Sequence, residues 1–349
     1  MRSKSMVGAF LALLSMASGQ TFTVCDPTKK DCPPNPAFGG EIDIDYTKGK
    51  NDFFEESSGT KLTYDKKLGA VFTIENEKDA PTIESPEFIF FGKLEVELMI
   101  APGAGIVTSI VLQSLTLDEI DLEWLGGDPN TVQTNYFSKG DTSTYDRGGT
   151  HPVSNASEFH TYTIDWTQES LIWSVDGEPV RTLTYEEAKG GTEYPQTPMQ
   201  IKLGSWVAGR PDAPQGTIDW AGGLANFDNG PSRAYYRRIS VTDYAGGIEG
   251  AKQYIYSDKS GTWESIVIKT DEGDFQSKGV NEDDDEDDES SSSVAPTTSA
   301  AVPSSTGEAE DSAGGDENDD EPDAASLAAQ AVTYVGAILS GAAIFANIL

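Results

Sequence analysis

Cysteine and histidine are scarce in this sequence, with two of each among 349 residues. Cys25 and Cys32 have six residues between them, and neither histidine lies near them along the chain. Structural metal sites in proteins use about four nitrogen or sulfur ligands, so a metal site at this pair is the weaker alternative. In a secreted chain the pair predicts one small disulfide loop, which pins a terminus more than it stabilises a domain.

Positive charge is also scarce, because 24 Lys and Arg face 58 Asp and Glu and the formal net charge is −34. Proteins that bind nucleic acids neutralise phosphates with basic side chains, so we expect no nucleic-acid partner. Much of the negative charge lies between residues 271 and 323, which hold 20 acidic residues against one lysine. The segment is otherwise mostly Ser, Gly, Thr, Pro and Ala, and it predicts a disordered acidic stalk that suits O-glycosylation.

The two ends of the chain have the patterns of processing signals. Residues 1–19 combine a basic start, an apolar run and a small-residue cleavage site, which predicts a secretory signal peptide. Residues 324–349 carry no charge and could span a bilayer. However, small residues at Ser312, Ala313 and Gly314 precede an acidic spacer and this tail, which favours a GPI attachment signal whose hydrophobic tail is removed.

A long helical period is absent from residues 20–270, where short apolar or alternating runs are separated by Gly, Pro and Asp. The pair Asp176 and Gly177 predicts a tight hairpin turn, and the one predicted helix is short, at residues 184–189. We therefore expect one all-β domain, an antiparallel β-sandwich. The predicted strands are residues 42–46, 70–74, 94–100, 106–112, 162–166, 171–175, 180–183, 199–203, 237–241 and 266–268.

One stretch alternates acidic and apolar residues. On a strand, Glu119, Asp121 and Glu123 would share one face, because successive side chains point to opposite faces. Glutamates leaning inward from both ends could reach the carboxyl separation of about 5 to 5.5 Å that retaining glycosidases use. The alternative is an ordinary half-buried strand whose acids are solvated. Against it, three like charges on one face repel each other, and no Lys or Arg lies between residues 105 and 138.

The domain contains six tryptophans, four of which fall into two kinds of sequence context. Trp166 and Trp173 lie in alternating strand patterns, which favours a place in the core. Trp206 and Trp220 lie in glycine-rich segments, where an indole is seldom buried unless the loop folds over a groove. Because flat aromatic faces stack on pyranose rings, the pattern is equally compatible with these two residues being platforms for sugars.

Residues 119–123 match the Glu-x-Asp-x-Glu signature of glycoside hydrolase family 16, in its unbulged form. The flanking segment 118–126 and the Gln-Thr-Asn-Tyr-Phe sequence at 133–137 resemble the fungal branch of that family, the GPI-anchored CRH-type transglycosylases that crosslink chitin to glucan in the cell wall. The resemblance extends over essentially the whole mature domain, the cysteine pair and the C-terminal tail. It implies a concanavalin-like β-jelly roll whose concave substrate cleft carries the acids.

Position by position, the resemblance implies that Glu119 is the nucleophile, Glu123 the general acid/base, and Asp121 the residue that modulates both. In the retaining mechanism one carboxylate attacks the anomeric carbon while a protonated carboxyl gives its proton to the leaving oxygen. Glu123 must therefore hold a proton near neutral pH, and neighbouring negative charge favours this.

The resemblance also implies residues that surround the substrate. Gln133 and Asn135 would bind hydroxyl groups of the donor sugar, and Trp206 and Trp220 would line the cleft. His160 and Tyr162 belong to an alternating run, so either could instead be an inward-pointing residue of a strand. The implied substrate-binding residues are Gln133, Asn135, Trp206, Trp220, Tyr162, Arg210 and His160.

The function expected from this resemblance is retaining transfer of a glycosyl unit from chitin, through a covalent Glu ester, to β-glucan or chitin. The alternatives are hydrolysis, as a chitinase or β-glucanase, and a non-catalytic wall lectin, which would have no use for the three acids. No cofactor is implied, since glycosyl transfer through carboxylates needs none. We expect a monomer, anchored by GPI at the plasma membrane and cell wall, with a surface loop glycosylated at the sequon of Asn155.

Overall fold

The computed structural model describes residues 23–144 and 146–278. The predicted signal peptide, most of the predicted stalk, and the predicted GPI signal with residues 312–314 lie outside this part of the chain. Within the described part, no helix has both the length and the apolar character needed to cross a membrane.

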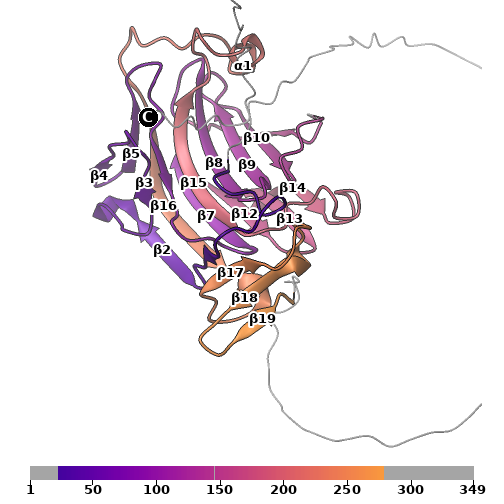
Figure 1. The fold of residues 1–349 in the computed structure, drawn as a ribbon. Helices are drawn as coiled ribbons and strands as arrows, with labels where there is room; N and C mark the ends of the chain where they lie inside the picture. The colour runs from indigo at the N-terminus through magenta and orange to yellow at the C-terminus, as the bar shows by residue number, and fades with distance from the viewer. Residues whose placement is uncertain (1–22, 145, 279–349) are drawn as a thin grey trace, which may run out of the picture. The chain divides into compact units, whose positions relative to one another are not determined.

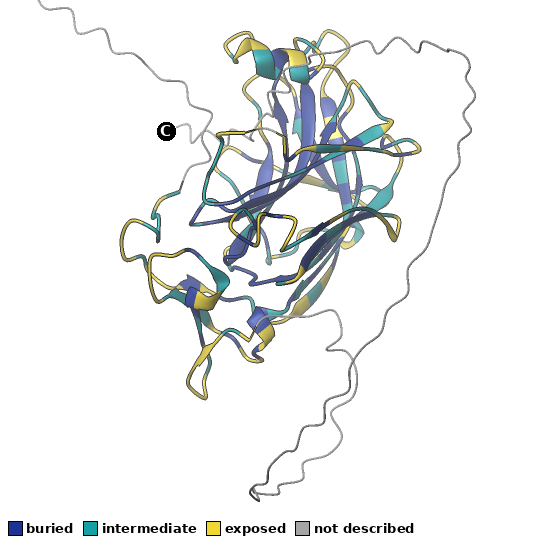
Figure 2. Ribbon diagram, turned by 90° about the vertical axis from the view of Figure 1, so that its right-hand side faces the viewer, coloured by how far each residue is buried: buried dark blue, intermediate teal, exposed yellow. Residues whose placement is uncertain are grey.

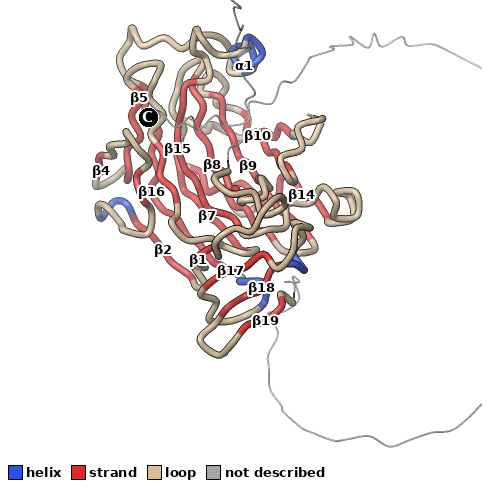
Figure 3. Tube along the Cα trace, viewed as in Figure 1, coloured by secondary structure: helices blue, strands red, loops and turns tan. Residues whose placement is uncertain are grey.

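Two large antiparallel sheets form most of the described chain (Figure 1; Figure 3). The first has seven strands in the order β11 (Gly149–Pro152), β10 (Thr131–Phe137), β9 (Glu119–Leu125), β8 (Ile106–Ser114), β15 (Met199–Val207), β6 (Thr82–Glu84) and β3 (Glu55–Glu56). The second has eight: β14 (Glu178–Thr184), β13 (Ser170–Val175), β12 (His160–Trp166), β7 (Gly92–Met99), β16 (Ser232–Asp243), β5 (Gly69–Ile74) and β4 (Thr63–Asp65), with β2 (Glu41–Asp45) also paired to β16. The predicted antiparallel β-sandwich is confirmed.

The hydrophobic core lies between the two large sheets. From β9, the side chain of Trp124 packs against Tyr162 of β12, with ring centroids 4.4 Å apart. Trp166 and Trp173 from the second sheet are completely buried, as their alternating patterns predicted. Figure 2 shows buried residues along the strands of both layers, with exposed residues mainly in the loops.

Two local predictions about strands are also confirmed. β8 forms where a strand was predicted at residues 106–112, and it is buried at all nine positions. The turn between β13 and β14 consists of Asp176 and Gly177, with φ angles of 51° and 84°. Two positive φ values are what a two-residue turn needs to match the twist of the flanking strands.

The predicted helix at residues 184–189 is wrong, because Thr184 ends β14 and residues 185–189 form turns. It does begin as a helix would: the Thr184 N–H donates to the Glu187 carboxylate, and the Glu187 N–H donates to the Thr184 hydroxyl. Lys189, Gly190 and Gly191 then all adopt positive φ, which ends the helix after one turn. In the part of the chain that the structure describes, the one α-helix is α1 (Gln215–Trp220).

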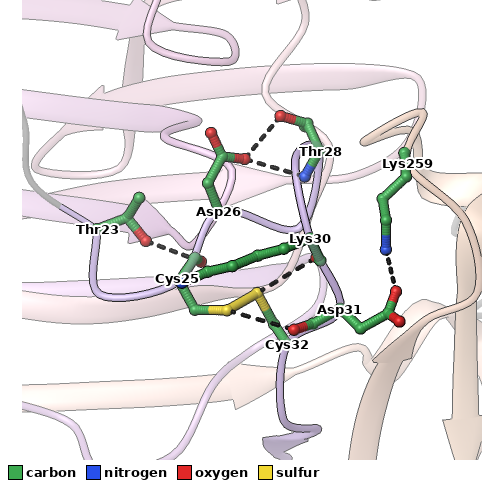
Figure 4. The surroundings of a disulfide bond; sticks show 8 residues. All are labelled: Thr23, Cys25, Asp26, Thr28, Lys30, Asp31, Cys32 and Lys259. Carbon is green, nitrogen blue, oxygen red and sulfur yellow. Dashed lines mark hydrogen bonds and ion pairs between the residues drawn. A yellow bond between two sulfur atoms is a disulfide. The ribbon is translucent and has the colours of Figure 1, made fainter.

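A small third sheet pairs β1 (Asn35–Pro36), β17 (Gln253–Tyr256), β18 (Ile266–Lys269) and β19 (Asp274–Gln276). β19 lies beyond residue 270, where the acidic composition had suggested that the domain ends. Near the N-terminus, a disulfide joins Cys25 to Cys32, and Lys259 forms an ion pair with Asp31 within that loop (Figure 4). The remaining short elements are the 3-10 helices η1 (Tyr46–Lys48), η2 (Ala245–Gly247) and η3 (Trp263–Ser265).

A buried carboxylate connects the small sheet to the sandwich. Asp243, the last residue of β16, accepts hydrogen bonds from the backbone N–H groups of Gly39, Phe90 and Ala245 and from the Tyr254 hydroxyl. Burial raises the pKa of Asp243 to about 6, although these four bonds act in the opposite direction. One side chain thereby joins two distant segments, at Gly39 and Phe90, to the nearby Ala245 and Tyr254.

Asp243 should make the stability of the domain depend on pH. Its pKa of about 6 in the folded state lies above the ordinary value of 3.8, so protonation favours folding. The stabilisation is fully present below about pH 4 and is lost as the pH rises through 6. The free energy of unfolding of the wild type, relative to Asp243→Asn, should fall by about 2 kcal/mol between pH 4 and pH 7 in urea titrations. Exposed Asp43→Asn is the control, and a pH-independent difference would contradict the assignment.

Candidate active site

The three acids of β9 lie on the sheet face that points away from the core. The intervening Ile120 and Leu122 belong to the core cluster, so alternation places Glu119, Asp121 and Glu123 on the opposite side. We call this side of the seven-stranded sheet the acidic face. The three acids are only 2%, 4% and 8% exposed, respectively. The alternative of an ordinary strand with solvated acids is therefore wrong.

Strand register brings two predicted residues beside the acids. On β10, Gln133 lies directly opposite Glu123, and Asn135 lies directly opposite Asp121. Directly opposite residues of an antiparallel pair share a face and have Cβ atoms about 4.5 to 5.5 Å apart. Both amides are partly exposed, so they remain accessible beside the buried carboxyl groups.

Burial and mutual repulsion change the acid strength of this group. Burial raises the pKa of Glu123 well above its ordinary value, and the negative charge of Glu119 raises it further. Burial likewise raises the pKa of Asp121, with further contributions from Glu119 and Glu123 and from its hydrogen bond to Glu119. Glu119 differs, because its Oε2 accepts a 2.8 Å hydrogen bond from the Gln113 amide. The arrangement favours a protonated Glu123 beside an ionised Glu119.

An apolar cluster covers the Glu123 end of the acidic face. The rings of Trp206, from β15, and Trp220, from α1, are stacked with centroids 6.1 Å apart and an interplanar angle of 27°. The Trp220 indole N–H donates to Gln133 Oε1 at 2.9 Å. The Trp206 indole faces Glu123 and opposes the rise of its pKa. Both tryptophans that the sequence offered as sugar platforms thus lie next to the acids.

Close backbone contacts explain the glycines around these tryptophans. The Gly209 N–H donates to the Gly105 carbonyl, and the Ala225 N–H donates to the Gly209 carbonyl, so three loops stack directly on one another. A Cβ at Gly209 would overlap the Gly223 carbonyl oxygen. At Gly105, where φ is +75°, a Cβ would lie 2.6 Å from the Ala225 nitrogen. Larger residues would separate the loops that hold Trp206 and Trp220 in place.

Two predicted substrate-binding residues lie on the second sheet, and the role of a third, Arg210, stays a prediction. Tyr162 and His160 belong to β12 of the second sheet, and Tyr162 is completely buried in the core, so the placement of both beside the acids is wrong. His160 Nδ1 lies 2.7 Å from Asp176 Oδ2, and its Nε2 lies 3.1 Å from the carbonyl oxygen of residue 155. Arg210 follows β15 and pairs with Asp212 at 3.5 Å. Alternation along one strand reveals two faces, but not which sheet the strand joins.

Two residues on the acidic face were missed by the sequence reasoning. Gln113, near the end of β8, lies opposite Glu119, and Lys202 Nζ of β15 donates to the side-chain oxygen Oε1 of Gln113 at 2.8 Å. The signals were weak: one long polar side chain closing an apolar run, and one lysine alternating with Ile201 and Leu203. Only the pairing of β15 with β8 brings them together.

Asp118 is a third residue whose role was not predicted. Its fully buried carboxylate accepts hydrogen bonds from the Lys139 and Gln196 N–H groups and from the Thr197 hydroxyl. These bonds fix the turn that leads from β8 into β9. The backbone at Glu119 is therefore positioned by contacts from two distant segments.

The acids on β9 should lower stability at neutral pH. Because the pKa of Asp121 is higher in the folded state than its ordinary value, its contribution favours folding at low pH and is lost as the pH rises. Asp121→Asn should therefore raise the free energy of unfolding at pH 7 by about 1 kcal/mol or more, and the gain should shrink toward pH 4. Denaturant titrations measure this, with exposed Asp228→Asn as the control. A loss of stability at pH 7 would contradict the prediction.

Comparison with known proteins places the chain among fungal relatives. It is 48% identical to Crh-like protein 5 of Aspergillus fumigatus over 75% of this chain and 66% of the relative. It is 47% identical to Crh-like protein 4 of the same fungus over 75% of this chain and 58% of the relative. The match therefore spans less than two thirds of the length of each of these two relatives. A Crh-like protein of Arthroderma benhamiae is 45% identical over 76% of this chain and 72% of the relative.

A solved structure and a family model agree with these relatives. The structure of Crh5 transglycosylase in complex with NAG matches with a TM-score of 0.67 and 49% sequence identity, covering 70% of this chain and 100% of that chain. Residues 41–222 match the model of glycosyl hydrolases family 16, and this range contains the entire acidic strand. The chain is similar to Crh-like proteins, and it belongs to glycosyl hydrolases family 16.

Proposed function

We propose that this protein is a retaining transglycosylase of the fungal cell wall that cleaves chitin and transfers the glycosyl unit to β-glucan or chitin. The observation that carries the proposal is the asymmetry of the buried acids: Glu119 accepts a hydrogen bond from an amide, whereas burial and the charge on Glu119 raise the pKa of Glu123. Similarity to a Crh5 transglycosylase that binds NAG supports a donor built from N-acetylglucosamine.

In the first step, Glu119 is the nucleophile. Its carboxylate oxygen forms a bond to the anomeric carbon while the glycosidic bond breaks, and Glu123 gives its proton to the departing sugar oxygen. Burial and the charge on Glu119 raise the pKa of Glu123, which keeps that proton available near neutral pH. Asp121 lies between the two glutamates and forms a hydrogen bond with Glu119. A protonated Asp121 donates this bond to the Glu119 carboxylate.

In the second step, a hydroxyl group of the acceptor sugar attacks the anomeric carbon. Its proton passes to Glu123, and the ester bond to Glu119 breaks, which restores both side chains. Water in place of the sugar would give hydrolysis. A sugar ring beside Glu123 could contact the apolar surface of the stacked Trp206 and Trp220. The partly exposed amide of Gln133 lies next to this surface. Such contacts favour a bound sugar over water as the acceptor.

A transfer assay tests this proposal. Chitin oligomers are mixed with a fluorescent laminari-oligosaccharide, and the products are separated by size. The wild type should move the label into larger products, and Glu119→Gln should lower this rate by about 1,000-fold or more while oligosaccharide binding persists. Glu95→Gln, on the second sheet, is the matched control. Shortened chitin products without label transfer would show a hydrolase, and full activity of Glu119→Gln would refute the site.

We also propose that the protein is secreted, glycosylated at Asn155 and held by a GPI anchor attached near Ala313, and that it acts as a monomer. Sequence patterns at both ends support secretion and GPI anchoring. The partly exposed Asn155 lies in a surface turn, which supports its glycosylation. Phosphatidylinositol-specific phospholipase C should release the protein from intact membranes. Replacing residues 312–314 with bulky side chains should instead leave it unanchored, and resistance of the wild type to the phospholipase would contradict GPI attachment.

A further inference from the structure

A chain of hydrogen bonds crosses three strands to reach Glu119. Lys202 Nζ, on β15, donates to Gln113 Oε1 on β8 at 2.8 Å, and Gln113 Nε2 donates to Glu119 Oε2 on β9 at 2.8 Å. The three side chains lie on the acidic face: Gln113 is directly opposite Glu119, and Lys202, which is directly opposite Val111, lies diagonally across from Gln113. We call Lys202 and Gln113 the amide relay.

The relay has a fixed direction. An ammonium group can only donate hydrogen bonds, so Lys202 must face the carbonyl oxygen of the Gln113 amide. The NH₂ group of Gln113 is then directed at Glu119, which must accept and is therefore favoured as a carboxylate. Without the lysine, the amide could turn around and present its oxygen to Glu119. Lys202 thus determines that Gln113 presents its NH₂ group, and not its oxygen, to Glu119.

The surroundings of Lys202 support a charged group. Lys202 is mostly buried, and burial lowers its pKa, while the negative charges of Glu84 and Glu119 oppose that change. Glu84 lies directly opposite Lys202 on β6. A lysine held between two acidic residues places a positive charge behind the relay, which polarises the Gln113 amide and strengthens its hydrogen bond.

We propose that Lys202 and Gln113 are positioning residues that stabilise Glu119 as the departing carboxylate, and so accelerate breakdown of the glycosyl ester more than its formation. This inference rests on the proposed function and adds a division of labour between its two steps. Neither residue needs to touch the reacting atoms, because both act through Glu119.

The charge balance of the reaction explains this preference. When the ester forms, the bond from Glu119 to the anomeric carbon is made and the carboxylate loses its negative charge. When the acceptor hydroxyl attacks, that bond breaks, its electron pair returns to Glu119, and the acceptor proton goes to Glu123. A donor aimed at Glu119 binds the full carboxylate more strongly than the ester oxygen. The relay therefore favours the step in which the charge returns.

The test separates the two steps in Lys202→Met and Gln113→Met. Chitin oligomers with an activated leaving group report ester formation as a burst, and label transfer to laminari-oligosaccharide reports the complete cycle. In both variants transfer should fall about 10- to 100-fold, as expected for loss of a hydrogen bond to a charged group. The burst rate should change much less, KM should fall together with kcat, and the glycosyl ester should accumulate in intact-protein mass spectra.

Controls distinguish the relay from a general loss of structure. Lys202→Arg keeps a charged donor and should recover most of the transfer rate, whereas Lys93→Met removes an exposed lysine of the second sheet and should behave as the wild type. Circular dichroism and thermal melts establish folding, and Gln113→Met tests the relay if Lys202→Met fails to fold. Equal losses in both steps, or no ester accumulation in a folded variant, would overturn the proposal. A wild type that transfers nothing would instead refute the proposed function.

Discussion

Three carboxyl groups on alternating positions of one strand are the constraint around which this domain is built. Glu119, Asp121 and Glu123 are each less than a tenth exposed, and like charges in such a place repel and lose hydration. The strand can carry them because its other face is fixed in the core by apolar side chains, among them the fully buried Trp124. The acids in turn require oriented partners on the neighbouring strands. Core packing on one face therefore supports a group of charges on the other that would be unfavourable in an exposed or isolated strand.

Much of the fold could be predicted from the sequence because the information was local. Alternation identified β9, the burial of Trp166 and Trp173, and the Asp-Gly hairpin, all of which depend on period-two geometry or on a turn of two residues. Predictions failed where the decisive contact was distant. Tyr162 has the alternation of a strand residue in either sheet, and only strand order places it in the core. The capping box at Thr184 is a genuine helix signal, but the positive φ of the three residues from 189 to 191 overrides it.

The same distinction applies to the site. The signature residues are contiguous, so a short pattern identifies them, and Gln133 and Asn135 follow in the next strand of a hairpin. Lys202, by contrast, is 89 residues from Gln113 in sequence, and a lysine in an alternating strand is ordinarily a solvated surface residue. Its importance depends on the register between β15 and β8, which no local pattern encodes. The loops that hold the tryptophans show the same limit, since their glycines are required by backbone contacts among three separate segments.

Two ends of one strand thus provide different environments for chemically identical side chains. At the Glu119 end, an amide directed by a partly buried lysine donates a hydrogen bond and favours negative charge. At the Glu123 end, burial and the negative charge on Glu119 raise the pKa of Glu123 and so retain its proton, although the Trp206 indole acts in the opposite direction. The two effects reinforce each other, because each increase in negative charge on Glu119 makes ionisation of Glu123 less favourable. Glu119 and Glu123 are four positions apart on one strand. Their different neighbours are sufficient to make one a nucleophile and the other a proton donor at the same pH.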